Sequence, residues 1–556
     1  MRRRFLLALS AFLLLLPGLA AARDTLTIGV SQYPSTLNPM IDAMLAKSYV
    51  LAATQRQLTI EGHDWETVCQ LCVKLPSLEE GDAETFPSKT EEGEPVTGVR
   101  KTYAIRDDAF WADGTPVTTD DVLFAWEMGR NPETGVDTLK AYQDVLDIEV
   151  DGPKRFTIVS RKLDYRYRSM GDFAVMPAHL DRPAFAEPKE YRNRTLYQTD
   201  PTNPGLWNGP YRVAEVQVGS QIVLARNEHW KGTPPAFDRV VIRAIENTSA
   251  LEANLLSGSI DMIAGESGLA IDQAIAFEKR HGDAYTVIYQ PGLIYEHLDV
   301  MLSNPILGDL KVRQALLHAV DREAINNRLF AGKQPVATGS VNPLDWTYTT
   351  EGVPTYPYDP AAAEALLEAA GWTPGPGGIR VNAEGQKLSV SLMTTAGNRT
   401  RELVQQVLAD YWKRVGVETV IRNEPPRVFF GETVSKRRFT GLAMFAWLSA
   451  PEHLPRTTLH SESIPTEANN WGGQNYTGYA SPEMDRLIDA IQIELDRDKR
   501  GALWAEFQRL YATDLPVLPL YFRADSYILP KWLEGVRPTG HKYTTTNWIE
   551  EWRVAE

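Results

Sequence analysis

Apolar residues repeat along the chain with two different periods, and the two periods alternate. Leu26, Ile28 and Val30 alternate with polar residues, which predicts a strand near the start of the chain. Further strands are predicted at 211–213, 221–226, 239–245 and 260–263. Leucines at helical spacing over 249–256 lie between the last two, so this stretch predicts a strand, helix, strand crossover unit. The pattern indicates an α/β fold.

Helical periods dominate after residue 300. Helices are predicted at 312–320, 359–371, 403–416 and 481–495, with strands at 388–392 and 417–421. Earlier in the chain, Thr118 and Asp121 have capping-box spacing ahead of a helix over 122–128. The acidic segment 79–95 is predicted to be a solvated loop. The basic and aromatic segment 161–168 could meet an anionic ligand, but a charged sheet edge is the preferred interpretation.

The first 22 residues have the pattern of a secretory signal peptide. Three arginines precede the apolar run 5–16, and the small residues Ala20 and Ala22 suit cleavage before Arg23. The run is too short to anchor the protein in a bilayer, and no cysteine lies near the cleavage site to accept a lipid. The sequence therefore predicts a soluble, exported protein without a lipid anchor.

Composition and charge restrict the function. The chain has 556 residues, of which 43% are hydrophobic and 23% charged, so it has the composition of a globular protein with two or three domains. Its formal net charge of −15 argues against a nucleic-acid partner, because phosphate binding needs a basic surface.

The two cysteines, Cys69 and Cys72, are predicted to form a structural disulfide, because exported cysteines are usually oxidised. A redox pair would need a strand before the first cysteine and a helix N-terminus beneath it, and that context is not evident. A zinc site would need two further ligands, and His63 alone does not make a second pair.

The sequence contains no complete catalytic or metal-binding motif. Gly265-Glu-Ser-Gly268 resembles a nucleophile elbow but is followed by Leu269, and the run 375–378 lacks the last glycine of a dinucleotide loop. The nine histidines are scattered, without zinc-binding spacing. We therefore predict no catalytic residues, no metal and no cofactor.

Several segments, in order, resemble a known family. They are the stretch 106–126 (RDDAFWADGTPVTTDDVLFAW), Asn208-Gly-Pro-Tyr-Arg212, Ala225-Arg-Asn-Glu-His-Trp230, Leu256-Ser-Gly-Ser-Ile-Asp261, Val312-Arg-Gln-Ala-Leu316 with Ala319-Val-Asp-Arg322, and Tyr358-Asp-Pro with Leu366 to Trp372. In these segments the chain is similar to the extracellular solute-binding proteins of family 5, which serve dipeptide, oligopeptide and nickel ABC importers.

The resemblance implies an α/β, two-lobed periplasmic binding protein fold of type II. Lobe I would comprise residues 24–62, 205–294 and 520–556, and lobe II residues 295–519. An extra domain, residues 63–204, would be inserted in lobe I.

The resemblance also implies ligand-binding residues on loops that face the cleft between the lobes. They are Tyr33 in the loop 32–38, Phe124 on a helix, Tyr295, Glu296 and Asp299 on the strand entering lobe II, and Trp447 and Ser449. Peptide binders usually carry an Asp shortly after this Trp to bind the peptide amine, but this chain has Leu448-Ser-Ala-Pro451. Glu296, Asp299 and Glu452 are the candidate substitutes.

The expected function is that of a monomeric periplasmic protein that closes its lobes on an oligopeptide-like ligand and delivers it to an inner-membrane ABC permease. A non-peptide solute such as a sugar, an opine, a metal complex or haem is the alternative within the family. A secreted hydrolase, or a binding protein that serves a chemoreceptor, remains a further alternative.

Overall fold

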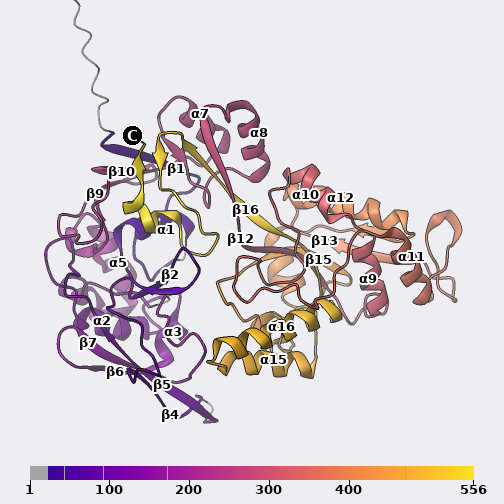
Figure 1. Cartoon of the computed structure of the whole chain (residues 1–556), viewed down its shortest axis with the longest axis horizontal. Helices are drawn as coiled ribbons and strands as arrows, with labels where there is room; N and C mark the ends of the chain where they lie inside the picture. The colour runs from indigo at the N-terminus through magenta and orange to yellow at the C-terminus, as the bar shows by residue number, and fades with distance from the viewer. Residues whose placement is uncertain (1–22, 43, 92, 172, 470, 556) are drawn as a thin grey trace, which may run out of the picture.

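A ten-stranded mixed sheet runs through the whole molecule (Figure 1). The computed structural model describes residues 23–42, 44–91, 93–171, 173–469 and 471–555, so the predicted signal peptide lies outside the described residues. The strands follow the order β14 (Glu418–Ile421), β13 (Ser389–Met393), β15 (Leu442–Leu448), β12 (Tyr285–Val300), β16 (Val517–Pro530), β11 (Met262–Ile263), β1 (Thr25–Val30), β10 (Arg239–Ala244), β9 (Gln221–Arg226) and β8 (Tyr211–Gln217).

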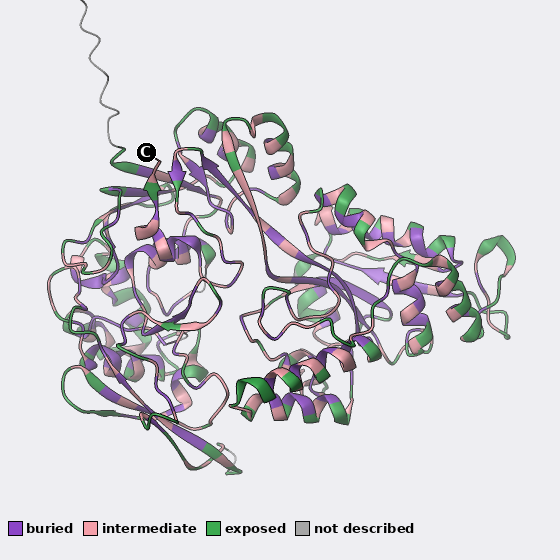
Figure 2. Ribbon diagram, viewed as in Figure 1, coloured by how far each residue is buried: buried purple, intermediate pink, exposed green. Residues whose placement is uncertain are grey.

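Two long antiparallel strands, β12 and β16, connect the two halves of the molecule. Figure 1 shows them running from the body near α7 (Thr248–Leu256) and α8 (Ile271–His281) into the body that carries the later helices. Their pairing is interrupted between Pro291 and Tyr295. β16 is buried along most of its length, whereas β12 is buried mainly from Gly292 onward (Figure 2). The predicted lobe boundaries at 294/295 and 519/520 therefore fall inside continuous strands.

The hydrophobic core is divided between the two halves. One large cluster combines residues between 26 and 264 with residues 527–552 of the C-terminal segment. A second cluster is built only from residues between 298 and 521. The C-terminal segment thus packs with the half in which the chain begins.

The predicted α/β pattern is confirmed by the elements around β1. Strands β10 and β11 both lie parallel to β1, one on each side of it, and α7 connects them. The predicted strand, helix, strand unit is therefore a crossover with β1 inserted between its two strands.

Helix ends follow the predicted capping residues closely. The backbone N–H of Thr118 donates to the Asp121 carboxylate at 2.8 Å at the start of α2 (Thr119–Gly129), which completes one half of the capping box. Asp359 and Ser481 accept from the first turns of α11 (Pro360–Ala369) and α15 (Pro482–Ile493). The other long helices are α1 (Leu45–Thr54), α9 (Leu310–His318), α10 (Arg322–Phe330), α12 (Arg399–Arg414) and α16 (Arg497–Asp514).

Residues 63–204 carry a second, four-stranded antiparallel sheet. Its strands are ordered β4 (Ala83–Lys89), β5 (Pro95–Ala104), β7 (Arg155–Ser160) and β6 (Val145–Val150). The prediction of a loop over 79–95 was wrong for residues 83–89, because β4 is hydrogen-bonded to β5 along its backbone while its one acidic side chain, Glu84, is exposed. The prediction of a sheet edge at 161–168 was also wrong, since β7 ends at Ser160.

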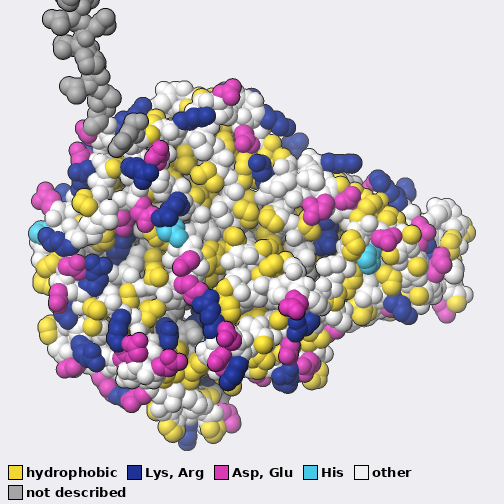
Figure 3. All heavy atoms as spheres, viewed as in Figure 1, with side chains coloured by type: hydrophobic (Ala, Val, Ile, Leu, Met, Phe, Trp, Pro, Cys, Tyr) yellow, Lys and Arg dark blue, Asp and Glu magenta, His cyan; other side chains and the backbone are white. Residues whose placement is uncertain are grey.

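The remaining elements are short. They are β2 (Thr59–Glu61), β3 (Thr67–Cys69), β17 (Leu533–Glu534), β18 (Arg553–Val554), α3 (Leu139–Gln143), α4 (Ala178–Asp181), α5 (Tyr191–Arg194), α6 (Leu196–Thr199), α13 (Pro426–Val428) and α14 (Arg456–Leu459). Among the described residues no helix combines the length and the apolar character needed to cross a membrane. Figure 3 shows acidic and basic side chains intermixed over the displayed face rather than segregated by sign.

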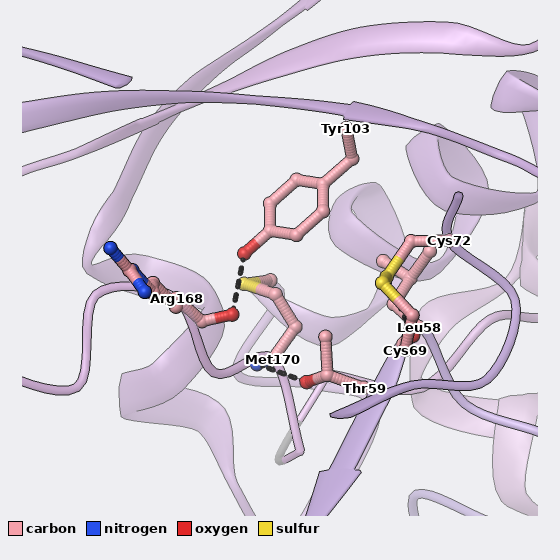
Figure 4. The surroundings of a disulfide bond; sticks show 7 residues. All are labelled: Leu58, Thr59, Cys69, Cys72, Tyr103, Arg168 and Met170. Atoms are coloured by element: carbon pink, nitrogen blue, oxygen red, sulfur yellow. Dashed lines mark hydrogen bonds between the residues drawn. A yellow bond between two sulfur atoms is a disulfide. The ribbon is translucent and has the colours of Figure 1, made fainter. Parts of the chain in front are cut away.

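The sulfur atoms of Cys69 and Cys72 are bonded to each other, beside β2 (Figure 4). Cys69 ends β3, which pairs with Thr59 of β2, and Cys72 is almost fully buried. Nearby, the Met170 N–H donates to the Thr59 hydroxyl at 2.7 Å. The disulfide thus closes a tight turn beside β2, the strand whose Thr59 hydroxyl accepts from Met170.

We predict that the disulfide is dispensable for ligand binding. Closing a loop of only four residues restricts the unfolded chain little, so a Cys69→Ser, Cys72→Ser variant should lose about 2 kcal/mol of unfolding free energy. Thiol titration of the unfolded, unreduced protein should find no free thiol, and denaturation should give the stability difference. A variant that folds normally but no longer binds ligand would contradict a purely structural role.

Candidate functional site

A cavity of about 260 Å³ lies against the part of β12 that belongs to residues 293–299. Side chains of a strand alternate between its two faces, so Leu293, Tyr295, His297 and Asp299 all face this cavity. The other walls come from the loops 340–347 and 448–459 and from α16. We call it the β12 cavity. It contains three of the predicted ligand residues from two neighbouring strands, Tyr295, Asp299 and Trp447, together with Ser449 directly after the second strand.

Trp447 lies on β15 directly opposite Tyr295. Its ring is partly buried and packs on Phe445 and Tyr476, with ring centroids 5.3 and 5.8 Å away. Ser449 follows at the end of the strand, where its N–H donates to the Leu293 carbonyl at 3.3 Å. The strand pairing therefore holds the Trp at the edge of the cavity with one side packed and the other available.

Buried polar groups form the inner wall of the β12 cavity. The hydroxyls of Tyr295 and Tyr511 are 3.2 Å apart, and His297 Nε2 is 3.2 Å from a carboxylate oxygen of Asp299. His297 is stacked on Tyr295 and meets the edge of Phe445. Rings in such contacts are held in one orientation, so the imidazole is fixed relative to the cavity.

Glu296 faces the opposite side of β12 and is fully buried. Arg401 Nε donates to one of its oxygens at 2.5 Å, and Arg523 Nε donates to the other at 2.9 Å. Burial raises the pKa of Glu296, but the two guanidinium groups outweigh it and hold the pKa below its ordinary value. The structure does not support Glu296 as a ligand contact or amine anchor, because both oxygens are already taken by arginines.

A second cavity, of about 530 Å³, lies where the two halves meet beside β12 and β16; we call it the crossing groove. Residues of both halves line it, among them Gln32, Glu266, Arg401, Arg523 and Asp525. Two of these acids have perturbed pKa values. Burial and then repulsion from Asp525 raise the pKa of Glu266 to about 8, and burial raises that of Asp525 to about 7 against the effect of Arg523.

These shifts predict that the protein becomes less stable as the pH rises through neutrality. A carboxyl group with a raised pKa in the folded state favours folding while it is protonated, and this contribution is lost between its unfolded and folded pKa values. The melting temperature should therefore fall between about pH 5 and 8, and less steeply in a Glu266→Gln variant. Thermal unfolding at several pH values measures this; identical slopes for variant and wild type would contradict it.

A third cavity, of about 620 Å³, separates residues 61–79 and 165–169 from residues 451–452 and 495–500. The two sides are nevertheless joined by two polar contacts. The N–H of Tyr165 donates to Gln492 O at 3.1 Å, and Arg497 forms an ion pair with Glu66 at 2.5 Å. Glu452, the third candidate amine anchor, accepts from Trp346 Nε1 at 2.5 Å and lies 3.6 Å from Arg500. The basic segment 161–168 thus contributes to a contact between the two halves.

Besides Glu296, two further predicted ligand residues lie outside the three cavities. Phe124 is fully buried in the core of residues 63–204, where it packs on Phe185 and Arg182. Tyr33 packs against the core of its own half, where burial raises the pKa of its hydroxyl. A fully buried ring offers no surface to a ligand, so the predicted contact by Phe124 does not fit the structure.

Sequence reasoning missed several residues that shape these cavities. His297 could have been found, because it lies two residues from both Tyr295 and Asp299 and must share their face of the strand. No sequence pattern around Arg401, Arg523 or Tyr511 marks them as cavity residues, because they come from segments distant in sequence from residues 293–299 of β12. The described residues hold no group of three or more His, Cys, Asp or Glu that could bind a metal ion.

Comparisons with known proteins agree with this architecture. The sequence model of the bacterial extracellular solute-binding proteins, family 5 (Middle), matches residues 97–460. The oligopeptide-binding protein AppA of Bacillus subtilis is 25% identical over 462 residues, which cover 80% of this chain and 79% of AppA.

Two solved structures extend the match to nearly the whole chain. The oligopeptide-binding protein of Thermus thermophilus, solved with a pentapeptide, has a TM-score of 0.67 and 27% identity, covering 95% of this chain and 96% of that one. NikA of Brucella suis, solved with Fe(III)-EDTA, has a TM-score of 0.75 but only 18% identity, covering 95% and 99%; it shows the fold alone. The fold is therefore the two-lobed α/β fold of periplasmic binding proteins, and the chain belongs to the bacterial extracellular solute-binding proteins of family 5.

Proposed function

We propose that this protein binds an oligopeptide between its two halves and delivers it to an ABC permease. The observation that carries the proposal is the β12 cavity, where a partly exposed Trp447 and buried polar groups of the later half meet beside the strands that connect the halves. The crossing groove, lined by residues of both halves, lies beside the same strands. Aromatic walls with a few fixed polar groups are typical of ligand sites. The Thermus thermophilus relative, solved with a pentapeptide, supports a peptide as the ligand class.

The proposal includes the cell compartment and the mode of action. The signal-peptide pattern of residues 1–22 supports export to the periplasm, where the protein would act as a monomer without catalysis. Because the two halves are joined by β12 and β16, closure would be a hinge motion at the interruption between Pro291 and Tyr295.

A thermal-shift screen with defined peptide pools tests the ligand class. A ligand present at 100 times its Kd should stabilise the protein by about 2.7 kcal/mol. Small-angle scattering with the best peptide should show a smaller radius of gyration than without it. If no peptide pool shifts the melting temperature while a sugar, an opine or a metal chelate does, the peptide assignment is wrong and the family's non-peptide alternative replaces it.

A further inference from the structure

The earlier half, which holds residues 63–204, meets the later half in two separate places. One is the crossing of β12 and β16, where both strands run from one half into the other. The other surrounds the third cavity, where residues of the earlier half face residues 451–452 and 495–500. In Figure 1, one end of α16 lies beside the half that carries β5, below the crossing. We call this second place the closing contact, because a hinge at the crossing would open and close it.

Tyr165 contributes three interactions to the closing contact. Its backbone N–H donates to the carbonyl oxygen of Gln492 at 3.1 Å, and its hydroxyl donates to the carbonyl oxygen of Glu452. The guanidinium of Arg500 lies 5.2 Å from the centroid of its ring. Burial raises the pKa of Tyr165, so the hydroxyl keeps its proton at neutral pH and remains a donor. One residue of the earlier half thus holds three segments of the later half.

Two other interactions across the closing contact are less specific. Arg497 pairs with Glu66, but their side chains are 49% and 40% exposed, and exposed ion pairs contribute little to stability. Leu495 packs against a small apolar cluster that contains Tyr167. Apolar packing has no preferred direction, whereas a hydrogen bond requires a defined distance and angle. The hydrogen bonds of Tyr165 therefore fix how the two sides are placed against each other.

The loop that Tyr165 holds, residues 448–453, is also a wall of the β12 cavity. Residues 448–450 and 453 line that cavity, whereas Pro451 and Glu452 between them line the third cavity. The backbone of Glu452 has a φ of 52°, in the left-handed region that a residue with a side chain adopts at a cost. Such a conformation persists only where the surroundings hold it. The loop 448–453 therefore depends on outside contacts for its shape.

Contacts from both halves hold Glu452. Its N–H donates to Asp345 at 2.7 Å, and its carboxylate accepts from Trp346 Nε1 at 2.5 Å, both within the later half. Its carbonyl oxygen accepts from the hydroxyl of Tyr165, which belongs to the earlier half. Asp345 itself lines the β12 cavity. The closing contact and the β12 cavity are therefore joined through one hydrogen-bonded loop.

From this arrangement we propose that Tyr165 is a positioning residue for ligand binding, which holds the loop 448–453 in its binding shape from the opposite half. Tyr165 lines the third cavity and not the β12 cavity, so it acts through the loop. The inference rests on the proposed peptide function and adds a residue to it. Coupling between two sites is reciprocal, so a peptide in the β12 cavity and the Tyr165 contact stabilise each other. Loss of the contact should act mainly on the rate at which a bound peptide leaves.

Tyr165→Phe tests the inference, because it removes the hydroxyl and keeps the ring. The probe is a pentapeptide selected in the thermal-shift screen, with its affinity measured by calorimetry and its rates by stopped-flow fluorescence. The variant should bind this peptide about five- to tenfold more weakly, as expected for one lost hydrogen bond, and the loss should lie in the dissociation rate. An unchanged Kd with an unchanged dissociation rate would overturn the inference.

Tyr211→Phe is the matched control for this substitution. The hydroxyl of Tyr211, on β8, donates to the carbonyl oxygen of Phe237 at 2.8 Å, so the control removes a similar hydrogen bond inside the earlier half. Tyr211→Phe should lower the stability and leave the affinity and the dissociation rate of the pentapeptide unchanged. If both variants weaken binding equally, the effect of Tyr165 is a general loss of stability and the inference is wrong.

Hydrogen exchange tests the inference on the wild type, without a substitution. The amide of Tyr165 donates across the closing contact, whereas the amide of Tyr167 donates to Asp164 O at 3.1 Å in the same segment. The pentapeptide should slow exchange of the Tyr165 amide by at least about tenfold and leave that of Tyr167 unchanged. Should Tyr165→Phe fail to fold, this measurement decides the question alone.

The outcomes separate the inference from the function on which it rests. A pentapeptide that binds the wild type without slowing exchange at Tyr165 would overturn the inference while the peptide function stands. Failure of every peptide to bind the wild type would overturn the proposed function itself, and the inference with it.

Discussion

Replacing Glu296 with glutamine is expected to lower the free energy of unfolding by about 3–5 kcal/mol, because removing one member of a buried ion pair leaves a buried charge uncompensated. Glu296 is fully buried, and Arg401 is only 9% exposed at its side chain. Arg523 is more exposed, at 35%, so water can replace part of its lost interaction. Most of the loss should therefore come from Arg401.

Urea denaturation followed by circular dichroism measures the loss. The matched control is the double substitution Glu296→Met, Arg401→Met, which removes both buried charges at once and should recover most of the stability. A loss below about 1 kcal/mol in Glu296→Gln would show that solvent reaches this ion pair.

The pH dependence of the unfolding free energy tests the role of Glu296 independently. Because the two arginines hold its pKa below the ordinary value, Glu296 stabilises the fold above the unfolded-state pKa, and this contribution is lost as the pH falls through the folded-state pKa. The difference in stability between wild type and Glu296→Gln should therefore shrink in acid. This dependence is opposite in sign to that expected of Glu266 and Asp525.

Local patterns predicted the elements well, because capping and periodicity act within a few residues. The helix that follows Asp359 and the alternation that ends at Val30 needed no knowledge of the rest of the chain. The acidic segment 79–95 was mispredicted because its strand is stabilised by backbone bonds to β5, while its side chains remain polar. Side-chain composition alone carries little information about such an edge strand.

The ligand residues were harder to predict, because a cleft is made by segments that are distant in sequence. The family resemblance placed Tyr295, Asp299 and Trp447 on one cavity, yet it also named Phe124, which is buried in a different core. Glu296 was chosen for its charge, but its pairing with Arg401 and Arg523 spans more than a hundred residues in each case. Only the folded chain shows which carboxylate is already paired and which is not.

Trp447→Ala is expected to weaken ligand binding by at least about 2 kcal/mol, or roughly 30-fold in Kd, as buried aromatic anchors of an interface do. The ring packs on Phe445 and Tyr476 but remains partly exposed and lines the β12 cavity. Since part of its surface is free without ligand, the unliganded protein should lose clearly less than the 3–5 kcal/mol that deletion of a fully buried Trp costs.

Trp412 is the matched control for this substitution. It is 1% exposed in the core of residues 298–521, and its indole N–H donates to Leu316 O at 2.9 Å. Trp412→Ala should cost the full 3–5 kcal/mol or so of a buried ring, and leave the affinity of the folded fraction unchanged. Calorimetry with the best peptide and urea denaturation on both variants separate the two roles. If Trp447→Ala destabilises the protein as much as Trp412→Ala and still binds peptide with wild-type affinity, Trp447 is a packing residue and the β12 cavity loses its aromatic wall as a binding element.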